Sequence, residues 1–213
     1  MIPVGNIPDS KNAAIFNILT DKLKSLEAAC IGITGAGGAG KSTLALNIAK
    51  YFGEDFCLAI DLDDYLISRS ERGRLGLTGY QPRANQLDLA REHILRLKSG
   101  HSITKPVYNH ATGENSKAVI VNPKPLLIFE GVTTLYSQLD DLYNISIFLD
   151  ALEETQIQSR IERDVNQRGY TREDALALYE NLKPHYKTYI EPTKSKATIT
   201  GEVGIDYVIH TKD

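Results

Sequence analysis

A glycine-rich stretch followed by Lys-Ser is the part of this sequence with the clearest chemical potential. Residues 35–42 read Gly-Ala-Gly-Gly-Ala-Gly-Lys-Ser, which is the phosphate-binding pattern GxxxxGK[ST]. In such a loop successive backbone N–H groups point at a phosphate, Lys41 reaches the β- and γ-phosphates, and the Ser42 hydroxyl holds Mg²⁺. The pattern predicts that a nucleoside triphosphate with Mg²⁺ binds to Gly35, Ala36, Gly37, Gly38, Ala39, Gly40, Lys41, Ser42 and Thr43.

Two carboxylates that follow apolar segments are candidates for the remaining chemistry. Asp63 comes just after the apolar residues 56–60, where it could accept the proton of a substrate hydroxyl; its alternative role is a helix cap or a solvated loop acid. Glu130 ends the apolar residues 125–129, where an uncompensated carboxylate would be costly. Facing Mg²⁺ would offset that cost, and the alternative is an exposed acid at the end of a strand.

Basic and aromatic residues further along the chain are candidates for contacts with phosphate or substrate. Arg160 and Arg163 are three residues apart on one predicted helix and can reach the same ligand; alternatively they belong to a surface salt-bridged face with Glu162 and Asp164. Tyr108 and His110 could contact a substrate or serve only as scaffold.

Arg83 suggests an anionic substrate, because a guanidinium can hold an anion as a two-pronged pair. It lies in residues 66–83, which carry four glycine or proline residues and predict a mobile loop. The same loop contains Arg69, Arg72 and Arg74, so the alternative is a basic loop that covers ATP phosphates or faces solvent.

The elements that must position these residues alternate between strands and helices. We expect strands at residues 29–34, 56–60, 125–129, 145–149 and 206–209, and a hairpin within 103–121. We expect helices at residues 10–27, 41–51, 87–99 and 153–167, and another that Thr171 caps and Pro184 kinks or ends. This order predicts an α/β fold with a parallel sheet covered by helices on both faces, and a ligand site at the carboxyl ends of the strands.

Length and composition favour one soluble domain spanning residues 1–213. The chain is 42% hydrophobic, 24% charged and carries a net charge of −3, so we expect no nucleic-acid partner. No apolar run has the length of a membrane span and no signal peptide is apparent, which predicts a cytoplasmic protein without a membrane partner. Cys30 and Cys57 fall in or beside predicted strands and are expected to be buried thiols.

Several of these segments together resemble the uridine kinase and phosphoribulokinase family of P-loop kinases. Asp63-Asp64-Tyr65, the strand ending in Glu130-Gly131, residues 160–169 and the run from Lys183-Pro184 to Pro192-Thr193-Lys194 are similar to that family's motifs, in the same order. The resemblance covers about residues 30–209. It implies an ATP- and Mg²⁺-dependent kinase acting on a small-molecule hydroxyl, with Asp63 as base, Ser42 and Glu130 supporting the metal, and Arg160 and Arg163 in a lid.

Within the single domain we expect an N-terminal helical extension at residues 1–28 and a hairpin insertion at about 101–122, and the resemblance implies a lid at about 153–170. Related kinases often form homo-oligomers. Arg83, Tyr108, His110 and Arg168 are the residues that we expect at the acceptor.

The acceptor itself stays open between three readings. Where uridine kinases have His-Pro-Asp this chain has Gln81-Pro82-Arg83, and Gln156 stands where they have another lid arginine. A nucleoside, as in uridine kinases, is one acceptor, and a sugar phosphate or a carboxylate-bearing alcohol is the other. A nucleotide-dependent switch without an acceptor is the third reading.

Overall fold

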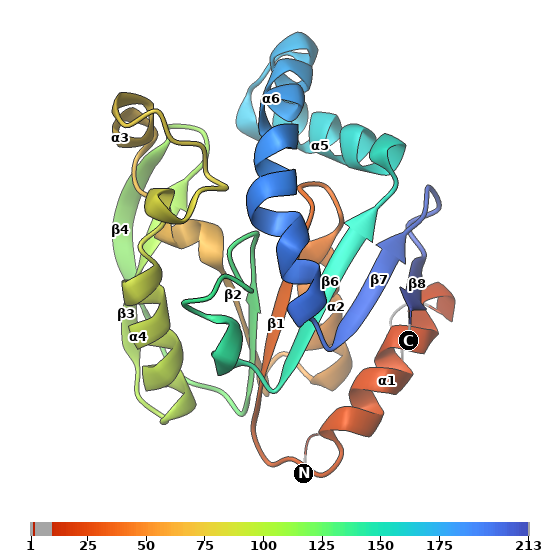
Figure 1. Ribbon diagram of the computed structural model, residues 1–213. Helices are drawn as coiled ribbons and strands as arrows, with labels where there is room; N and C mark the ends of the chain where they lie inside the picture. The colour runs from red at the N-terminus through yellow and green to blue at the C-terminus, as the bar shows by residue number, and fades with distance from the viewer. Residues whose placement is uncertain (1, 3–9, 213) are drawn as a thin grey trace.

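A six-stranded sheet in the order β2-β5-β1-β6-β7-β8 forms the centre of the protein. The computed structural model describes residue 2 and residues 10–212. Neighbouring strands are parallel except for β7 and β8, which run antiparallel. The predicted α/β fold is therefore confirmed, as a mostly parallel sheet (Figure 1). Its strands are β1 (Ala29–Gly35), β2 (Cys57–Asp61), β5 (Leu126–Glu130), β6 (Ile145–Ala151), β7 (Ile199–Val203) and β8 (Ile209–Lys212).

Helices cover both faces of this sheet, with α6 in front of it and α2 behind it in Figure 1. Successive side chains of a strand point to opposite faces, so the continuous apolar strands feed two cores. In β5, Leu126 and Ile128 pack with the core of one face, whereas Leu127 and Phe129 pack with the other. The helices are α1 (Ala13–Leu23), α2 (Lys41–Phe52), α4 (Leu87–Lys98), α5 (Glu153–Arg168) and α6 (Arg172–His185).

A separate hairpin and a short helix stand beside the carboxyl ends of the strands. The hairpin pairs β3 (Ile103–Asn109) with β4 (Glu114–Val121) and lies within the predicted insertion. Helix α3 (Arg69–Arg74) lies within residues 66–83, where we had expected only a loop. The sequence feature that marks the start of this helix is an N-cap: the Ser68 hydroxyl accepts a hydrogen bond of 3.1 Å from the Glu71 N–H.

The C-terminal strand prediction was wrong in position. Residues 206–208 belong to the connection between β7 and β8, and only Ile209 of the predicted segment lies in a strand, as the first residue of β8. A glycine in the middle of β7, Gly201, hid the strand in the sequence, although its buried and half-buried residues alternate as a strand requires. Helix α6 ends at His185, directly after Pro184, and continues as a π-helical turn over Tyr186–Ile190, as expected for a proline that removes a helix hydrogen bond.

The structure also tests the expected start of the N-terminal helix and the expected burial of the two cysteines. Helix α1 begins at Ala13 rather than Ser10, after a 3₁₀ turn, while residues 1 and 3–9 of the predicted extension lie outside the described residues. Cys30 and Cys57 are buried free thiols, as expected. Within the described part of the chain, no helix combines the length and the apolar character needed to cross a membrane.

Candidate active site

The glycine-rich loop joins β1 to α2 and packs against the start of α5. Gly38 has a φ of 87°, and a Cβ there would lie 2.6 Å from the Gln156 carbonyl oxygen, so only glycine allows this approach. The Lys41 ammonium is buried and donates to the carbonyls of Gly35 and Ala36, at 3.2 and 2.9 Å. The strand–loop–helix arrangement is the one expected of a phosphate-binding loop.

Ser42 and Glu130 meet at this edge of the sheet. The Ser42 hydroxyl donates a hydrogen bond of 2.6 Å to Oε1 of Glu130. Glu130 is buried, at 6% exposure, which excludes the alternative of an exposed strand-end acid. Burial raises the pKa of Glu130, while the Lys41 charge and the Ser42 hydrogen bond oppose this shift. A hydroxyl and a carboxylate are hard oxygen donors of the kind that Mg²⁺ prefers, so this pair fits a magnesium site.

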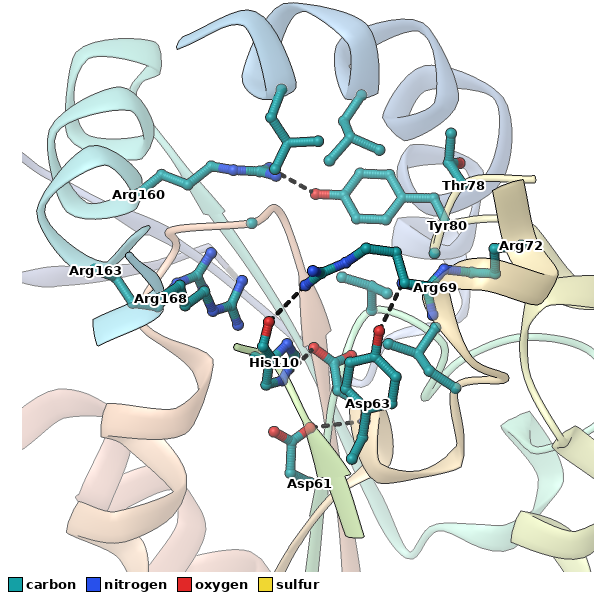
Figure 2. Close-up of a pocket in the computed structure, with 18 of the residues that line it drawn as sticks. Asp61, Asp63, Arg69, Arg72, Thr78, Tyr80, His110, Arg160, Arg163 and Arg168 are labelled. Carbon is teal, nitrogen blue, oxygen red and sulfur yellow. Dashed lines mark hydrogen bonds and ion pairs between the residues drawn. The ribbon is translucent and has the colours of Figure 1, made fainter. Parts of the chain in front are cut away.

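The three neighbouring acids at the end of β2 and just after it have three different surroundings. The Asp61 carboxylate accepts a hydrogen bond of 2.8 Å from the Asp63 N–H, so Asp61 caps the 3₁₀ turn (Leu62–Tyr65) that follows. Asp64 forms an ion pair with Lys105 of the hairpin. The Asp63 carboxylate lines the cavity, as Asp61 also does, and because Asp61 is the cap, Asp63 is not the helix cap that we had considered (Figure 2).

His110, at the hairpin tip, lies beside Asp63. Its Nε2 is 4.0 Å from Oδ2 of Asp63. Burial and the Arg168 charge lower the pKa of His110, although Asp63 opposes them. The site therefore favours a neutral imidazole beside Asp63.

Arg69 and Arg72 of α3 face the same space as the hairpin tip. Arg69 donates to the carbonyl oxygen of His110, and Arg72 donates a hydrogen bond of 2.8 Å to the Tyr108 hydroxyl. The Arg72 guanidinium also lies over the Tyr108 ring, 5.3 Å from its centroid. These contacts hold two guanidinium groups at the wall of the cavity.

The arginines of α5 gather around one buried carboxylate. Asp164 has no exposed surface, and its side chain lies 3.0 Å from Arg163, 3.2 Å from Arg168 and 3.7 Å from Arg160. The alternative of a surface salt-bridged face is right about the ion pairs with Asp164 and wrong about the surface, because Asp164 and Arg160 are buried. A carboxylate inside the protein needs such partners. Asp164 accepts hydrogen bonds from Arg163 and Arg168 and forms only an ion pair with Arg160.

These groups line one cavity of about 650 Å³. Six cationic side chains and three carboxylates face it, which favours an anionic ligand. Predicted site residues among its walls are Gly37, Lys41, Ser42, Asp63, Tyr108, His110, Glu130, Arg160, Arg163 and Arg168.

Among the four residues predicted to contact the acceptor, Arg83 is the one that does not line this cavity. It lies in the 3₁₀ turn (Pro82–Ala84), where its neighbour Ala84 is the buried residue and Arg83 itself is exposed. Arg69 and Arg72, from the same sequence segment, line the cavity instead.

Some residues of the cavity were not singled out from the sequence. Tyr80, Tyr170 and Asn181 line it from three separate segments. None of them belongs to a motif, so only the tertiary fold identifies them.

The sequence and the fold are similar to those of known kinases. The sequence profile of the Phosphoribulokinase / Uridine kinase family matches residues 30–208. A phosphoribulokinase from Synechocystis sp. is 40% identical over 185 residues, covering 86% of this chain and 56% of that protein. A uridine kinase from Clostridium perfringens is 35% identical over 191 residues, covering 84% of this chain and 92% of that protein. The chain thus spans little more than half the length of the phosphoribulokinase.

A solved structure shows the same fold at lower identity. The phosphoribulokinase from Rhodobacter spheroides superimposes with a TM-score of 0.63 at 18% identity, covering 84% of this chain and 71% of that one.

Proposed function

This chain belongs to the phosphoribulokinase/uridine kinase family, and from that premise we propose that it is an ATP-dependent kinase for an anionic acceptor. The acceptor is a small molecule that carries a hydroxyl group and a phosphate or carboxylate. The observation that carries this proposal is the excess of cationic over carboxylate side chains in the cavity, six against three. A phosphoryl donor engages some of these cations, while Arg69 and Arg72 stand on the side of the hairpin and are suited to hold the anionic end of the acceptor.

In the proposed reaction, the oxygen of the acceptor hydroxyl bonds to the γ-phosphorus of ATP while Asp63 accepts the proton of that hydroxyl. The bond from that phosphorus to the bridging oxygen breaks, and ADP leaves. Lys41, Arg160 and Arg163 stabilise the negative charge of the group in transfer. Ser42 and Glu130 would hold Mg²⁺, which when bound neutralises charge on the phosphates.

A nucleoside acceptor is the second candidate. Tyr108 and His110 lie edge to face, with ring centroids 5.1 Å apart, at the wall of the cavity. Such a pair could contact a flat base, and the relative from Clostridium perfringens is a uridine kinase. A switch without any acceptor is the third.

An acceptor panel tests the three candidates. ADP release is measured with sugar phosphates (ribulose phosphate among them), the matching unphosphorylated sugars, hydroxy acids, uridine and cytidine. We expect an anionic acceptor to support turnover and its uncharged counterpart to fail. Turnover with uridine or cytidine alone would favour the nucleoside candidate, and slow turnover that no acceptor changes would favour the switch.

A further inference from the structure

Tyr80 connects the acceptor side of the cavity to an arginine of α5. It is buried, and its hydroxyl accepts a hydrogen bond of 3.1 Å from Nη1 of Arg160 (Figure 2). A Cβ on Gly37 would lie 2.7 Å from the Tyr80 hydroxyl and 2.8 Å from Arg160 Nη1. The phenol, the guanidinium and the phosphate-binding loop therefore meet at one point.

The segment that carries Tyr80 is held in place by its neighbours on both sides. The Tyr136 hydroxyl donates to the Tyr80 carbonyl. The Asn85 amide donates to the carbonyls of Gly79 and Gln81, at 3.1 and 3.0 Å. These bonds restrain the backbone at Tyr80 and on either side of it, and so help to fix the position of the Tyr80 ring.

Arg160 in turn relies on Tyr80 for its orientation. Its Nε is buried without a hydrogen-bond partner among the described residues, and it faces Oδ2 of Asp164 at 3.7 Å, beyond hydrogen-bond length. The hydrogen bond to Tyr80 is thus the directional contact of this guanidinium. Because Tyr80 lies in the segment that follows α3, this bond ties the arginines of the acceptor side to α5.

We propose that Tyr80 is a positioning residue for phosphoryl transfer, whose hydroxyl holds Arg160 over the phosphate-binding loop. This inference rests on the proposed kinase activity and adds the residue that joins its two halves. The hydroxyl accepts from Arg160, so its own proton remains to be donated into the cavity. Arg160 acts on the group in transfer, and Tyr80 acts through Arg160.

Tyr80→Phe removes only the hydroxyl and tests the proposal. We expect kcat to fall about tenfold, in the range for one hydrogen bond to a charged group, while KM for ATP and for the acceptor stays within about twofold. In an Arg160→Ala background, Tyr80→Phe should have no further effect, because the partner is already gone. Tyr51→Phe is the control, since it also removes a buried tyrosine hydroxyl, one that contacts Thr20 away from the cavity.

A second readout does not depend on knowing the acceptor. The side-chain ¹⁵N resonances of Arg160, assigned by their loss in Arg160→Lys, should shift in Tyr80→Phe and stay unchanged in Tyr51→Phe. An unshifted resonance overturns the proposal, as do a wild-type kcat in Tyr80→Phe or independent effects of the two substitutions. Failure of every acceptor with the wild-type protein would instead defeat the proposed kinase function, while a shifted resonance would still support the Tyr80–Arg160 link.

Discussion

Ser42 and Glu130 are joined by a hydrogen bond of 2.6 Å, although they lie 88 residues apart in the sequence. The contact exists because Ser42 lies in the first turn of α2, just after the loop that follows β1, and Glu130 ends the neighbouring strand β5. Each is an oxygen donor, and the carboxylate is buried. This pairing of a hydroxyl at the start of α2 with a strand-end carboxylate makes the edge of the sheet a candidate magnesium site.

Glu130→Gln tests that site. The amide keeps the size of the side chain and can still accept from Ser42, but it loses the charge that attracts the metal. We expect the apparent affinity for Mg²⁺, measured from ADP release at fixed ATP, to fall about 10- to 100-fold. Glu154→Gln changes an exposed acid of α5 and should leave the titration unchanged. Identical Mg²⁺ titrations for wild type and Glu130→Gln would remove Glu130 from the metal site.

Asp63→Asn tests the candidate base. The amide cannot accept the hydroxyl proton, so we expect turnover to fall by about 10²–10⁴-fold, the usual contribution of a positioned general base. Binding of a non-hydrolysable ATP analogue, measured by calorimetry, should stay the same, because the phosphate-binding loop is untouched. Wild-type turnover in this variant would exclude the role.

Arg72→Ala tests the anionic acceptor. Arg72 lines the cavity, and losing its guanidinium should raise KM for an anionic acceptor about tenfold or more, the effect of one charge-assisted hydrogen bond. Arg74→Ala is the matched control, because Arg74 lies on the same helix but is exposed. Arg83→Ala should also leave KM unchanged. A larger effect of Arg83→Ala than of Arg72→Ala would contradict the arrangement of this site.

The donor half of the candidate site could be predicted from the sequence, and the acceptor half could not. Glu130 ends one continuous apolar strand, and Lys41 and Ser42 begin the helix after the loop that follows another. The order of these strands sets the edge of the sheet where the three residues meet. Arg83, Arg69 and Arg72 share one irregular segment, where no periodicity says which side chain faces inward. Tyr80 could not be predicted either, because its partner Arg160 lies 80 residues away in the sequence and only the fold brings them together.

Asp64 and Lys105 attach the hairpin to the rest of the protein. Their side chains form an ion pair with exposures of only 17% and 11%, and Asp64 also accepts a hydrogen bond of 2.9 Å from the Tyr108 N–H. Asp64→Ala leaves the Lys105 charge without its partner, so we expect a loss of about 3 kcal/mol in the free energy of unfolding. Denaturant unfolding measures this loss. The double variant Asp64→Ala/Lys105→Met should recover part of it, and an unchanged stability of Asp64→Ala would show that the hairpin is held by other contacts.

His93 makes the stability of the protein depend on pH. It is buried on α4 with Nδ1 2.9 Å from the Tyr65 hydroxyl, and burial lowers its pKa below the usual value of about 6.5. The unfolded chain therefore binds the proton more readily than the folded one, so the free energy of unfolding falls as pH drops below about 6.5. The charge of Glu92 opposes the lowering of the His93 pKa, whereas the charges of Arg96 and Lys105 reinforce it. One such proton contributes a slope of at most about 1.4 kcal/mol per pH unit.

Denaturant unfolding of wild type and His93→Gln between pH 7.5 and 5.0 isolates the contribution of His93, because groups distant from His93 cancel in the difference. We expect wild type to lose more stability than His93→Gln on acidification, and parallel curves would mean that His93 does not titrate differently in the two states.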